Sequence, residues 1–110
     1  MNDFINAYIE AIRFTDFGGD SEIPADAEFA PATKARIGRD CLAFYHKCKP
    51  LIEGREEQAG HDFWLTRQGH GAGFWDGDWP EPAAAALTQE SHRFGAFELY
   101  LGDDEFVRHQ

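Results

Sequence analysis

Ala59–Asp78, with the sequence AGHDFWLTRQGHGAGFWDGD, is the stretch that decides the fold of this chain. It holds two of the three tryptophans, two of the five histidines, five of the 11 glycines and one basic residue, Arg67. Glycines allow backbone conformations that other residues avoid, and large aromatic side chains dominate the energetics of protein cores. No other stretch is so rich in residues that shape the backbone or perform chemistry.

An alternating pattern inside this block predicts strands. The side chains of Phe63–Thr66 alternate between two faces of an extended chain, which is the period of a half-buried strand. The glycine-rich segment Gln68–Gly73 follows, and its glycines favour positive φ or a close approach of the backbone. Phe74 and Trp75 would then begin a returning strand. The sequence therefore predicts a β-hairpin across this block.

Two helices are predicted before the block. Asn2 or Asp3 can cap a first helix that ends near Phe14–Asp16. Pro31 is suited to the first turn of a second helix, and Pro50 disfavours helix at the residue before it, so this helix should stop or kink there. One apolar face along the second helix has spacings of four and three residues, and its members are Ile37, Cys41, Phe44, Cys48 and Leu51.

The remaining elements follow the block. Asp78 can cap a third helix with its body at Ala83–Phe94. Alternation over Phe97–Leu101 predicts a strand, and Phe106–Arg108 a second short one. The acidic segment that ends at Glu28 is expected to be a loop. We therefore expect an α+β fold in one domain, residues 1–110, with the order α-α-β-β-α-β-β and an antiparallel sheet packed against the helices.

Composition and cysteine spacing limit the classes to which this protein can belong. The chain has 110 residues, 43% of them hydrophobic, and a net charge of −10. No stretch approaches the roughly 20 apolar residues that cross a bilayer, and the acidic N-terminus lacks the basic start of a signal peptide. Cys41 and Cys48 lie two helical turns apart, on the order of 10 Å by helical rise, which is too far for a disulfide. We therefore expect a cytoplasmic protein with two buried thiols and no membrane partner.

The charge is distributed unevenly along the chain. Residues 14–32 hold five acids and no base, residues 33–55 hold six bases and two acids, and residues 56–110 hold eleven acids and three bases. Net acidity argues against direct binding of nucleic acid, because that binding needs lysine and arginine to displace phosphate counterions. It is compatible with a surface that competes with nucleic acid for a basic partner, or with a role in solubility alone.

The residues of the block have several possible chemical roles. A phosphate loop needs a strand, glycines and a helix that begins with a lysine, and this context is missing. His61, His70, Asp62 and Asp76 could approach one another as metal ligands, but their spacing matches no established zinc pattern. General acid–base work by His70 with Asp76 is the remaining catalytic option. We expect no catalytic residue, no metal and no cofactor.

Arg67 and the tryptophans have structural and functional interpretations. As the one base in an aromatic, acidic block, Arg67 should pair with a carboxylate or stack on Trp64, Phe74 or Trp75. The functional alternative to this structural role is an ion pair between Arg67 and a carboxylate of a partner protein. Five large aromatic residues between Phe63 and Trp79 are more than a small domain commonly buries, so an exposed tryptophan could anchor an interface.

The block AGHDFWLTRQGHGAGFWDGDWPEP, with AYIEAI near the start and FGAFELYLGDD near the end, resembles a family of small, largely uncharacterised proteins encoded in tailed bacteriophages and prophages. The resemblance spans most of the chain; the Ala59–Asp78 block is its most specific part, and residues 18–57 are less characteristic. It implies expression in a bacterial host cytoplasm and carries over no catalytic residue. Small acidic phage proteins of this kind often bind host proteins, which by analogy includes restriction and CRISPR effectors.

These observations lead to one main hypothesis and two alternatives. The main hypothesis is a non-enzymatic phage accessory protein whose acidic, DNA-mimicking surface inhibits a host defence protein with a basic nucleic-acid-binding site. One alternative is a small hydrolase or nucleotide-processing enzyme that uses the His61–Asp78 region, possibly with a metal; another is a virion or replication component. The candidate partner-binding residues are Asp16, Asp20, Glu22, Asp26, Glu28, Asp76, Asp78, Trp79, Glu81, Asp103, Asp104 and Glu105.

Overall fold

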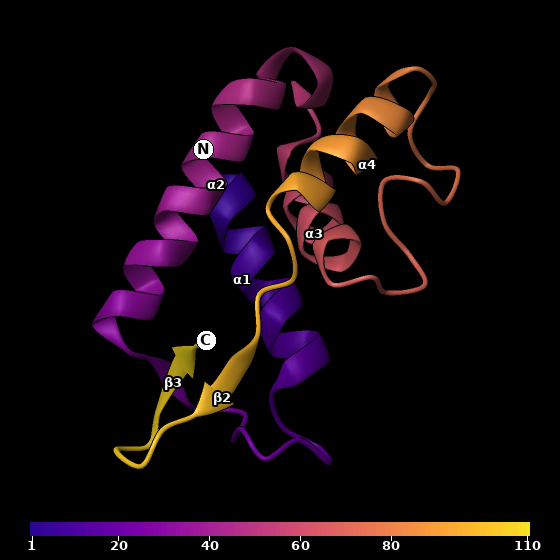
Figure 1. Ribbon diagram of the computed structural model, residues 1–110. Coiled ribbons are helices and arrows are strands. Elements are labelled where there is room, and N and C mark those ends of the chain that lie inside the picture. The colour runs from indigo at the N-terminus through magenta and orange to yellow at the C-terminus, as the bar shows by residue number, and fades with distance from the viewer.

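Helices form one end of the molecule and a small sheet forms the other, as the computed structural model, which describes all 110 residues, shows in Figure 1. The fold is α+β, as predicted, but its element order differs from the predicted one. The elements are α1 (Asn2–Asp16), β1 (Glu28–Phe29), α2 (Pro31–Ile52), α3 (Glu56–Arg67), α4 (Ala83–Arg93), β2 (Leu99–Leu101) and β3 (Phe106–His109). No helix is both long and apolar enough to cross a membrane.

The predicted hairpin in the Ala59–Asp78 block is wrong. Its first half is helix α3 and its second half is an irregular loop that leads to α4. Helix α3 is buried on most of its sides. Both members of the adjacent pair Phe63 and Trp64 are buried, and so are both members of the adjacent pair Thr66 and Arg67. A helix buried all round lacks the one-sided apolar stripe by which helices are recognised in a sequence. The apparent two-residue alternation was therefore accidental.

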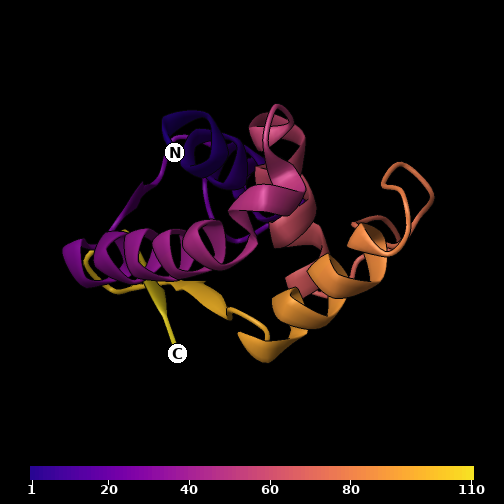
Figure 2. The ribbon, with the colours of Figure 1, turned by 90° about the horizontal axis from the view of Figure 1, so that it is seen from above.

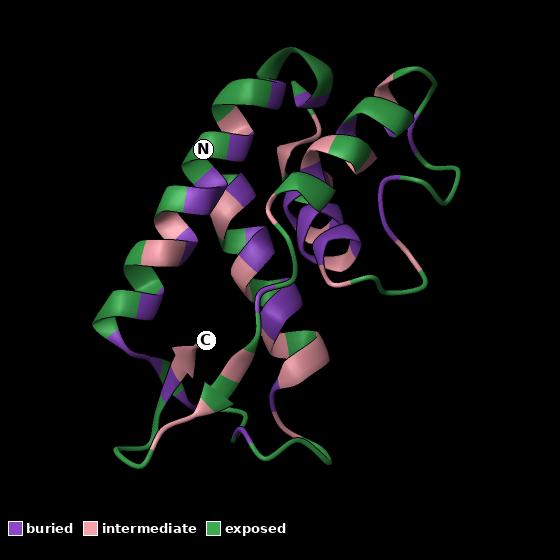
Figure 3. Cartoon of the chain, viewed as in Figure 1, coloured by how far each residue is buried: buried purple, intermediate pink, exposed green.

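Aromatic rings from α1, α2 and α3 make the centre of the core. The rings of Phe44 and Phe63 stack with their centroids 4.1 Å apart, and Phe4 stacks on both of them. Trp64 meets Tyr8 edge to face at 5.5 Å. All five side chains are fully buried. Figure 3 shows the buried residues on the sides of the helices that face one another.

A glycine lets helices α1 and α3 touch. A Cβ atom at Gly60 would lie 2.2 Å from the carbonyl oxygen of Phe4 and 3.0 Å from the backbone nitrogen of Tyr8. Contacts this short with backbone cannot be relieved by a rotamer change, so only glycine permits the observed separation of the two helices. The view from above in Figure 2 shows α1 beside α3 at the same end of the molecule.

The loop after α3 is held against the core by Thr66 and Phe74. The backbone N–H of Phe74 donates to Thr66 Oγ1 at 3.0 Å, and the Phe74 ring is fully buried. A Cβ at Gly73 would lie 2.3 Å from the same hydroxyl oxygen. The predicted role of these glycines in backbone approach is therefore confirmed at Gly73, and Gly69 has the predicted positive φ of 74°.

The sheet is mixed and not purely antiparallel as predicted. Its strand order is β1-β3-β2, with β2 and β3 antiparallel and β1 parallel to β3. Strand β1 was expected to be loop, because its two residues, Glu28 and Phe29, carry no pattern of their own. Their pairing with Phe106 and Val107 joins segments almost 80 residues apart in the chain.

The remaining helix predictions hold for the helix bodies and for some of the helix ends. Helix α2 begins at Pro31 as predicted and continues through Pro50 to Ile52, so of the stop or kink predicted at Pro50 the stop is wrong. The body of α4 matches its prediction, but Pro82 and not Asp78 occupies the N-cap position. Helix α1 ends at Asp16 as predicted, with no side-chain cap at its start.

Both cysteines are free and buried, as predicted. Burial raises the pKa of the Cys41 thiol well above its ordinary value and raises the pKa of Cys48 to about 11. Because the thiolate is the reactive form of cysteine, both groups behave in the folded protein as small apolar side chains.

Candidate functional site

The structure divides the predicted partner-binding acids into two groups. The larger group, here called the sheet-end acidic surface, comes from the end of α1, the α1–β1 loop, β1 and the β2–β3 turn, which lie at the same end of the molecule in Figure 1. It comprises Asp16, Asp20, Glu22, Asp26, Glu28, Asp103, Asp104 and Glu105. The smaller group is Asp76, Asp78 and Glu81, on the loop before α4. The acids therefore do not form one continuous strip.

Two neighbouring hollows connect the parts of the sheet-end acidic surface. Asp16, Asp20 and Glu22 line the first, and Asp103 and Asp104 line the second. Both hollows are also lined by the same two residues of strand β2, Tyr100 and Leu101. Glu28 joins the surface from β1, because its register partner in β3 is Phe106, immediately after the β2–β3 turn. Carboxylates from opposite ends of the sequence thus share one surface.

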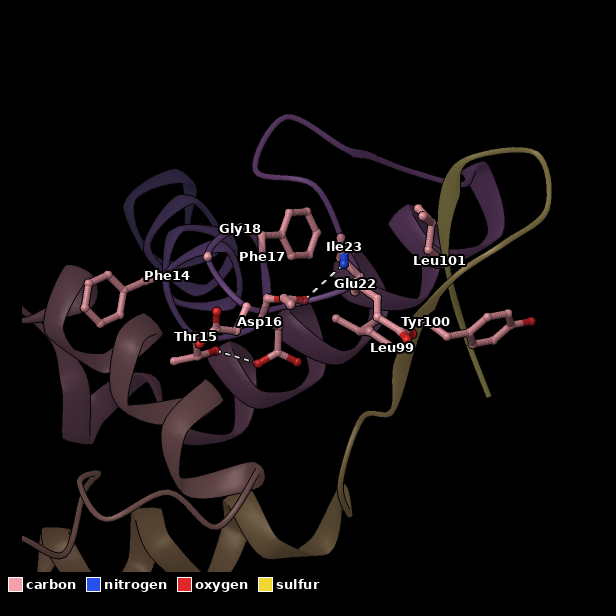
Figure 4. A pocket seen from close by; sticks show the side chains of 13 residues that line it. Phe14, Thr15, Asp16, Phe17, Gly18, Glu22, Ile23, Leu99, Tyr100 and Leu101 are labelled. Atoms are coloured by element: carbon pink, nitrogen blue, oxygen red, sulfur yellow. Dashed lines mark hydrogen bonds between the residues drawn. The ribbon is translucent and has the colours of Figure 1, made fainter.

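The first hollow lies between the end of α1 and strand β2 (Figure 4). Its volume is about 680 Å³, and its walls combine carboxylates with apolar side chains. Phe14 stands at one side and is 87% exposed, while Tyr100 stands at the other and is 43% exposed. A hollow with this lining suits a cationic side chain whose methylene stem packs on rings.

Backbone hydrogen bonds fix the loop that carries the acids. Gly18 has a φ of 73° and donates its N–H to the Ile23 carbonyl at 2.7 Å, which closes the turn. Ser21 Oγ donates to the carbonyl of Asp16 and accepts the N–H of Ile23. Arg13 Nη1 donates to the Ala27 carbonyl at 3.0 Å. The acids of this loop are therefore presented on a hydrogen-bonded turn.

Little of the negative charge on this surface is neutralised within the protein. Arg108 pairs with Asp104 and holds the pKa of that carboxyl below its usual range. Arg13 is directed to a backbone carbonyl and to the rings of Phe17 and Phe29 instead of a carboxylate. The other seven acids of the surface form no ion pair. Most of the surface charge is thus free to interact with a partner.

Trp79 is not part of an exposed surface, and its assignment as a binding residue is wrong. The side chain is buried, with 4% of the residue exposed. Its indole N–H donates to Asp62 Oδ2 at 2.7 Å, and the guanidinium of Arg55 lies 3.9 Å from the centre of its ring. Trp75, 53% exposed, is the tryptophan of the block that faces solvent.

Burial raises the pKa of Asp62, and the negative charges of Asp76 and Asp78 add to the shift, while the hydrogen bond from Trp79 opposes it. A folded-state pKa above the unfolded one means that the ionised carboxyl disfavours folding. Asp62 therefore contributes most to stability when it is protonated, below its unfolded-state pKa, and this contribution is lost as the pH rises through its folded-state pKa.

Asp62→Asn is therefore expected to raise the free energy of unfolding at pH 7 by up to about 1 kcal/mol. The amide oxygen can still accept from the Trp79 indole, and the buried charge is gone. Urea denaturation of the variant and the wild type should show this gain shrink as the pH falls through the raised folded-state pKa of Asp62, because the wild-type carboxyl then becomes protonated. Asp103→Asn, an exposed control, should show no gain at either pH. A variant less stable than wild type at pH 7 would contradict the prediction.

The histidines of the block line a third hollow, of about 540 Å³, between α1 and the end of α3. His61 Nε2 lies 3.0 Å from Glu10 Oε1, and His70 lines the same hollow. Thr15 is the residue of this lining that carries a hydroxyl group. Its oxygen accepts a hydrogen bond from the Trp64 indole N–H at 2.8 Å, so this hydroxyl has a structural role. A carboxylate–imidazole pair can orient a general base, and here it could act only on water or on a substrate group.

The four residues considered as metal ligands in the sequence, His61, Asp62, His70 and Asp76, do not form a metal site. No three histidine, cysteine or acidic side chains come close enough together to hold a metal ion. His61 pairs with Glu10 on one side of α3, whereas Asp62 bonds to Trp79. Sequence reasoning missed Glu10, because nothing in its own helix signals a partner 51 residues away.

Arg67 has the structural role that the sequence favoured. Its Nη2 lies 2.9 Å from Asp40 Oδ2, and its side chain is completely buried. It also lies over aromatic rings, but these belong to Phe63, Phe94 and Phe97, with Phe97 the closest at 4.9 Å, and not to the predicted Trp64, Phe74 or Trp75. Because it is fully enclosed, Arg67 cannot grip a partner's carboxylate.

Comparisons of the chain with models of known protein families, with curated proteins and with solved structures each found no match.

Proposed function

We propose that this chain is a non-enzymatic binding protein that covers a basic, nucleic-acid-binding surface of another protein with its sheet-end acidic surface. The observation that carries the proposal is the gathering of acids from residues 16–28 and 103–105 at one end of the fold, where only one of them is paired with a cation. Complementary surface potential steers association and selects partners of opposite charge.

Exposed aromatic residues beside the acids support a protein partner. Phe14, Tyr100 and Phe106 are all at least 38% exposed, and each lies within three residues of one of the acids in the sequence. Aromatic side chains at the centre of a charged surface are frequent anchors of protein–protein interfaces. A surface that served solubility alone would not need them.

The class of partner follows from the charge and from the sequence resemblance. A surface of closely set carboxylates presents the charge of a phosphate backbone, so it competes for the lysines and arginines of a nucleic-acid channel. The likeness to phage-encoded proteins suggests a host defence protein, either a CRISPR effector or a restriction enzyme. In this proposal the protein acts as an inhibitor in the bacterial cytoplasm.

Competition with DNA tests the proposal. Purified CRISPR effectors and restriction enzymes would be bound to a labelled DNA duplex, and its displacement by the protein followed by fluorescence anisotropy at about 50 mM and about 200 mM salt. We expect displacement of DNA from at least one of these enzymes, weaker at the higher salt. A lack of displacement from every enzyme at the lower salt would overturn the proposal.

Two variants of equal charge separate a local surface from net charge. The first combines Asp16→Asn, Asp20→Asn and Glu22→Gln, and the second combines Asp76→Asn, Asp78→Asn and Glu81→Gln. The first should weaken displacement by about tenfold, since exposed charge pairs contribute roughly 0.2–1 kcal/mol each. The second should change it by less than about threefold. Equal losses in both would show that only net charge matters.

A further inference from the structure

The outer edge of strand β2 offers free backbone groups next to the acids. We infer that this edge accepts an extended segment of the partner as an added strand, with lysine or arginine side chains reaching Asp16, Asp20 and Glu22. This inference rests on the proposed function and specifies how the partner is recognised. Strand addition to a sheet edge supplies affinity through main-chain hydrogen bonds and specificity through alternate side chains.

The register of the β2–β3 ladder identifies the free groups. Gln110 donates to the Glu98 carbonyl and Gly102 donates to the Phe106 carbonyl. In an antiparallel pair, hydrogen-bonded positions alternate with non-bonded ones, so Tyr100, paired with Arg108, is the bonded residue between them. The N–H and C=O groups of Leu99 and Leu101 therefore point away from β3.

The sheet order leaves this edge open. Strand β3 is central, so the side of β2 away from β3 faces no other strand. No hydrogen bond within the protein uses the backbone groups of Leu99 or Leu101 on that side. The hollow of about 680 Å³ lies there, between β2 and the α1–β1 loop. An added strand would run along this hollow, about 4.8 Å from β2.

The two faces of β2 set the side-chain pattern of the segment. Figure 4 shows Leu99 directed toward Glu22 and Tyr100 directed to the opposite side. An added strand alternates in the same way, so every second side chain would lie on the Glu22 side and the others beside Tyr100. Basic residues fit the first set of positions and apolar or aromatic residues fit the second.

Charge excludes a second copy of this chain as the occupant. Two copies joined at their β2 edges would bring Asp16, Asp20 and Glu22 of each toward the same group in the other. Like charges set opposite one another destabilise such a pairing. The short strand and flanking acids protect the edge from self-association, which leaves it to a cationic segment.

Peptide binding tests strand addition directly. The probe is a fluorescein-labelled nine-residue peptide that alternates lysine and valine, and binding is followed by anisotropy. Two further peptides carry backbone N-methyl groups, one on every lysine and the other on every valine. We expect one N-methylated set to weaken binding more than tenfold and the other to change it by less than about threefold, because only alternate N–H groups face β2.

A matched pair of protein variants tests the same edge. Leu101→Pro removes an outward N–H, and proline is tolerated at such positions of edge strands. Leu101→Ala removes a comparable amount of side chain and keeps the N–H. We expect about tenfold weaker peptide binding by the proline variant than by the alanine variant, with the circular dichroism spectra of both unchanged. If the proline variant unfolds, the N-methylated peptides decide the question on the wild-type protein.

The outcomes separate this inference from the proposed function. Equal effects of the two N-methylated sets would overturn strand addition, while displacement of DNA from a defence enzyme would still support the proposed function. The role of charge would be overturned if the two N-methylated sets differed as expected but a peptide with glutamine in place of lysine bound with unchanged affinity. Alternation together with weaker binding to the Asp16/Asp20/Glu22 variant would support the whole inference.

Discussion

Arg67→Met is expected to lower the free energy of unfolding by about 3–5 kcal/mol, the largest effect of any single replacement considered. The guanidinium is fully buried, and each of its three nitrogens has a partner. Nε donates to the Gly95 carbonyl at 2.7 Å, Nη1 donates to the Tyr8 hydroxyl at 2.9 Å, and Nη2 pairs with Asp40. Methionine keeps the apolar stem, but the buried Tyr8 hydroxyl loses its donor and the Gly95 carbonyl loses its hydrogen bond.

Asp40 makes the loss larger. This carboxylate is buried and would keep only Arg36, whose Nε lies 3.0 Å away, and the distant Arg39 as cationic partners. Removing one member of a buried ion pair costs far more than the pair contributes, because the remaining charge is left without full compensation. Urea denaturation at neutral pH measures the effect.

An exposed arginine provides the control. Arg93 has a side chain that is 70% exposed and lies 4.0 Å from Glu90, so Arg93→Met should change stability by less than about 0.5 kcal/mol. Similar losses in the two variants would contradict the structure around Arg67.

Gly60→Ala is expected to lower the free energy of unfolding by about 3 kcal/mol. The added methyl would lie 2.2 Å from the Phe4 carbonyl oxygen and 2.9 Å from the Ala7 Cβ. Helix α1 would have to move away from α3, and this movement would open the stacking between Phe4 and Phe63. The midpoint of urea denaturation should fall accordingly.

Gly38→Ala is the matched control, because it makes the same change within a helix. No atom lies within 4 Å of a Cβ built at Gly38 in α2. Alanine there should raise stability by roughly 0.5–1 kcal/mol through its better helix propensity. If Gly60→Ala stabilised the protein as well, the close approach of α1 and α3 would be wrong.

The sequence predicted best where burial is one-sided. Helix α2 has a polar outer face, so the spacing of Ile37, Cys41 and Phe44 revealed it. Helix α3 has only a narrow, partly exposed side, which includes His61 and Leu65, and the same reasoning turned Phe63–Thr66 into a strand. Strand β1 was missed for a related reason, since two residues cannot show a period.

The candidate site also has features that the sequence shows locally and features that depend on distant contacts. The acidity of residues 16–28 and 103–105 could be read directly from the sequence, but their meeting at one end depends on the pairing of β1 and β2 with β3. The burial of Trp79 depends on Asp62 and Arg55, which belong to other elements. Neither fact has a local signal.

The amino-acid sequence was sufficient to predict the α+β class, the bodies of α1, α2 and α4, the two terminal strands and the excess of negative charge. Local periodicity and composition carry this information, because each reflects the contrast between buried and exposed sides of one segment. The folded structure was needed to see that the Ala59–Asp78 block is a buried helix and a packed loop, and that two acidic segments share one surface. These outcomes depend on contacts between segments distant in sequence, which Gly60, Arg67 and the β3 ladder make possible.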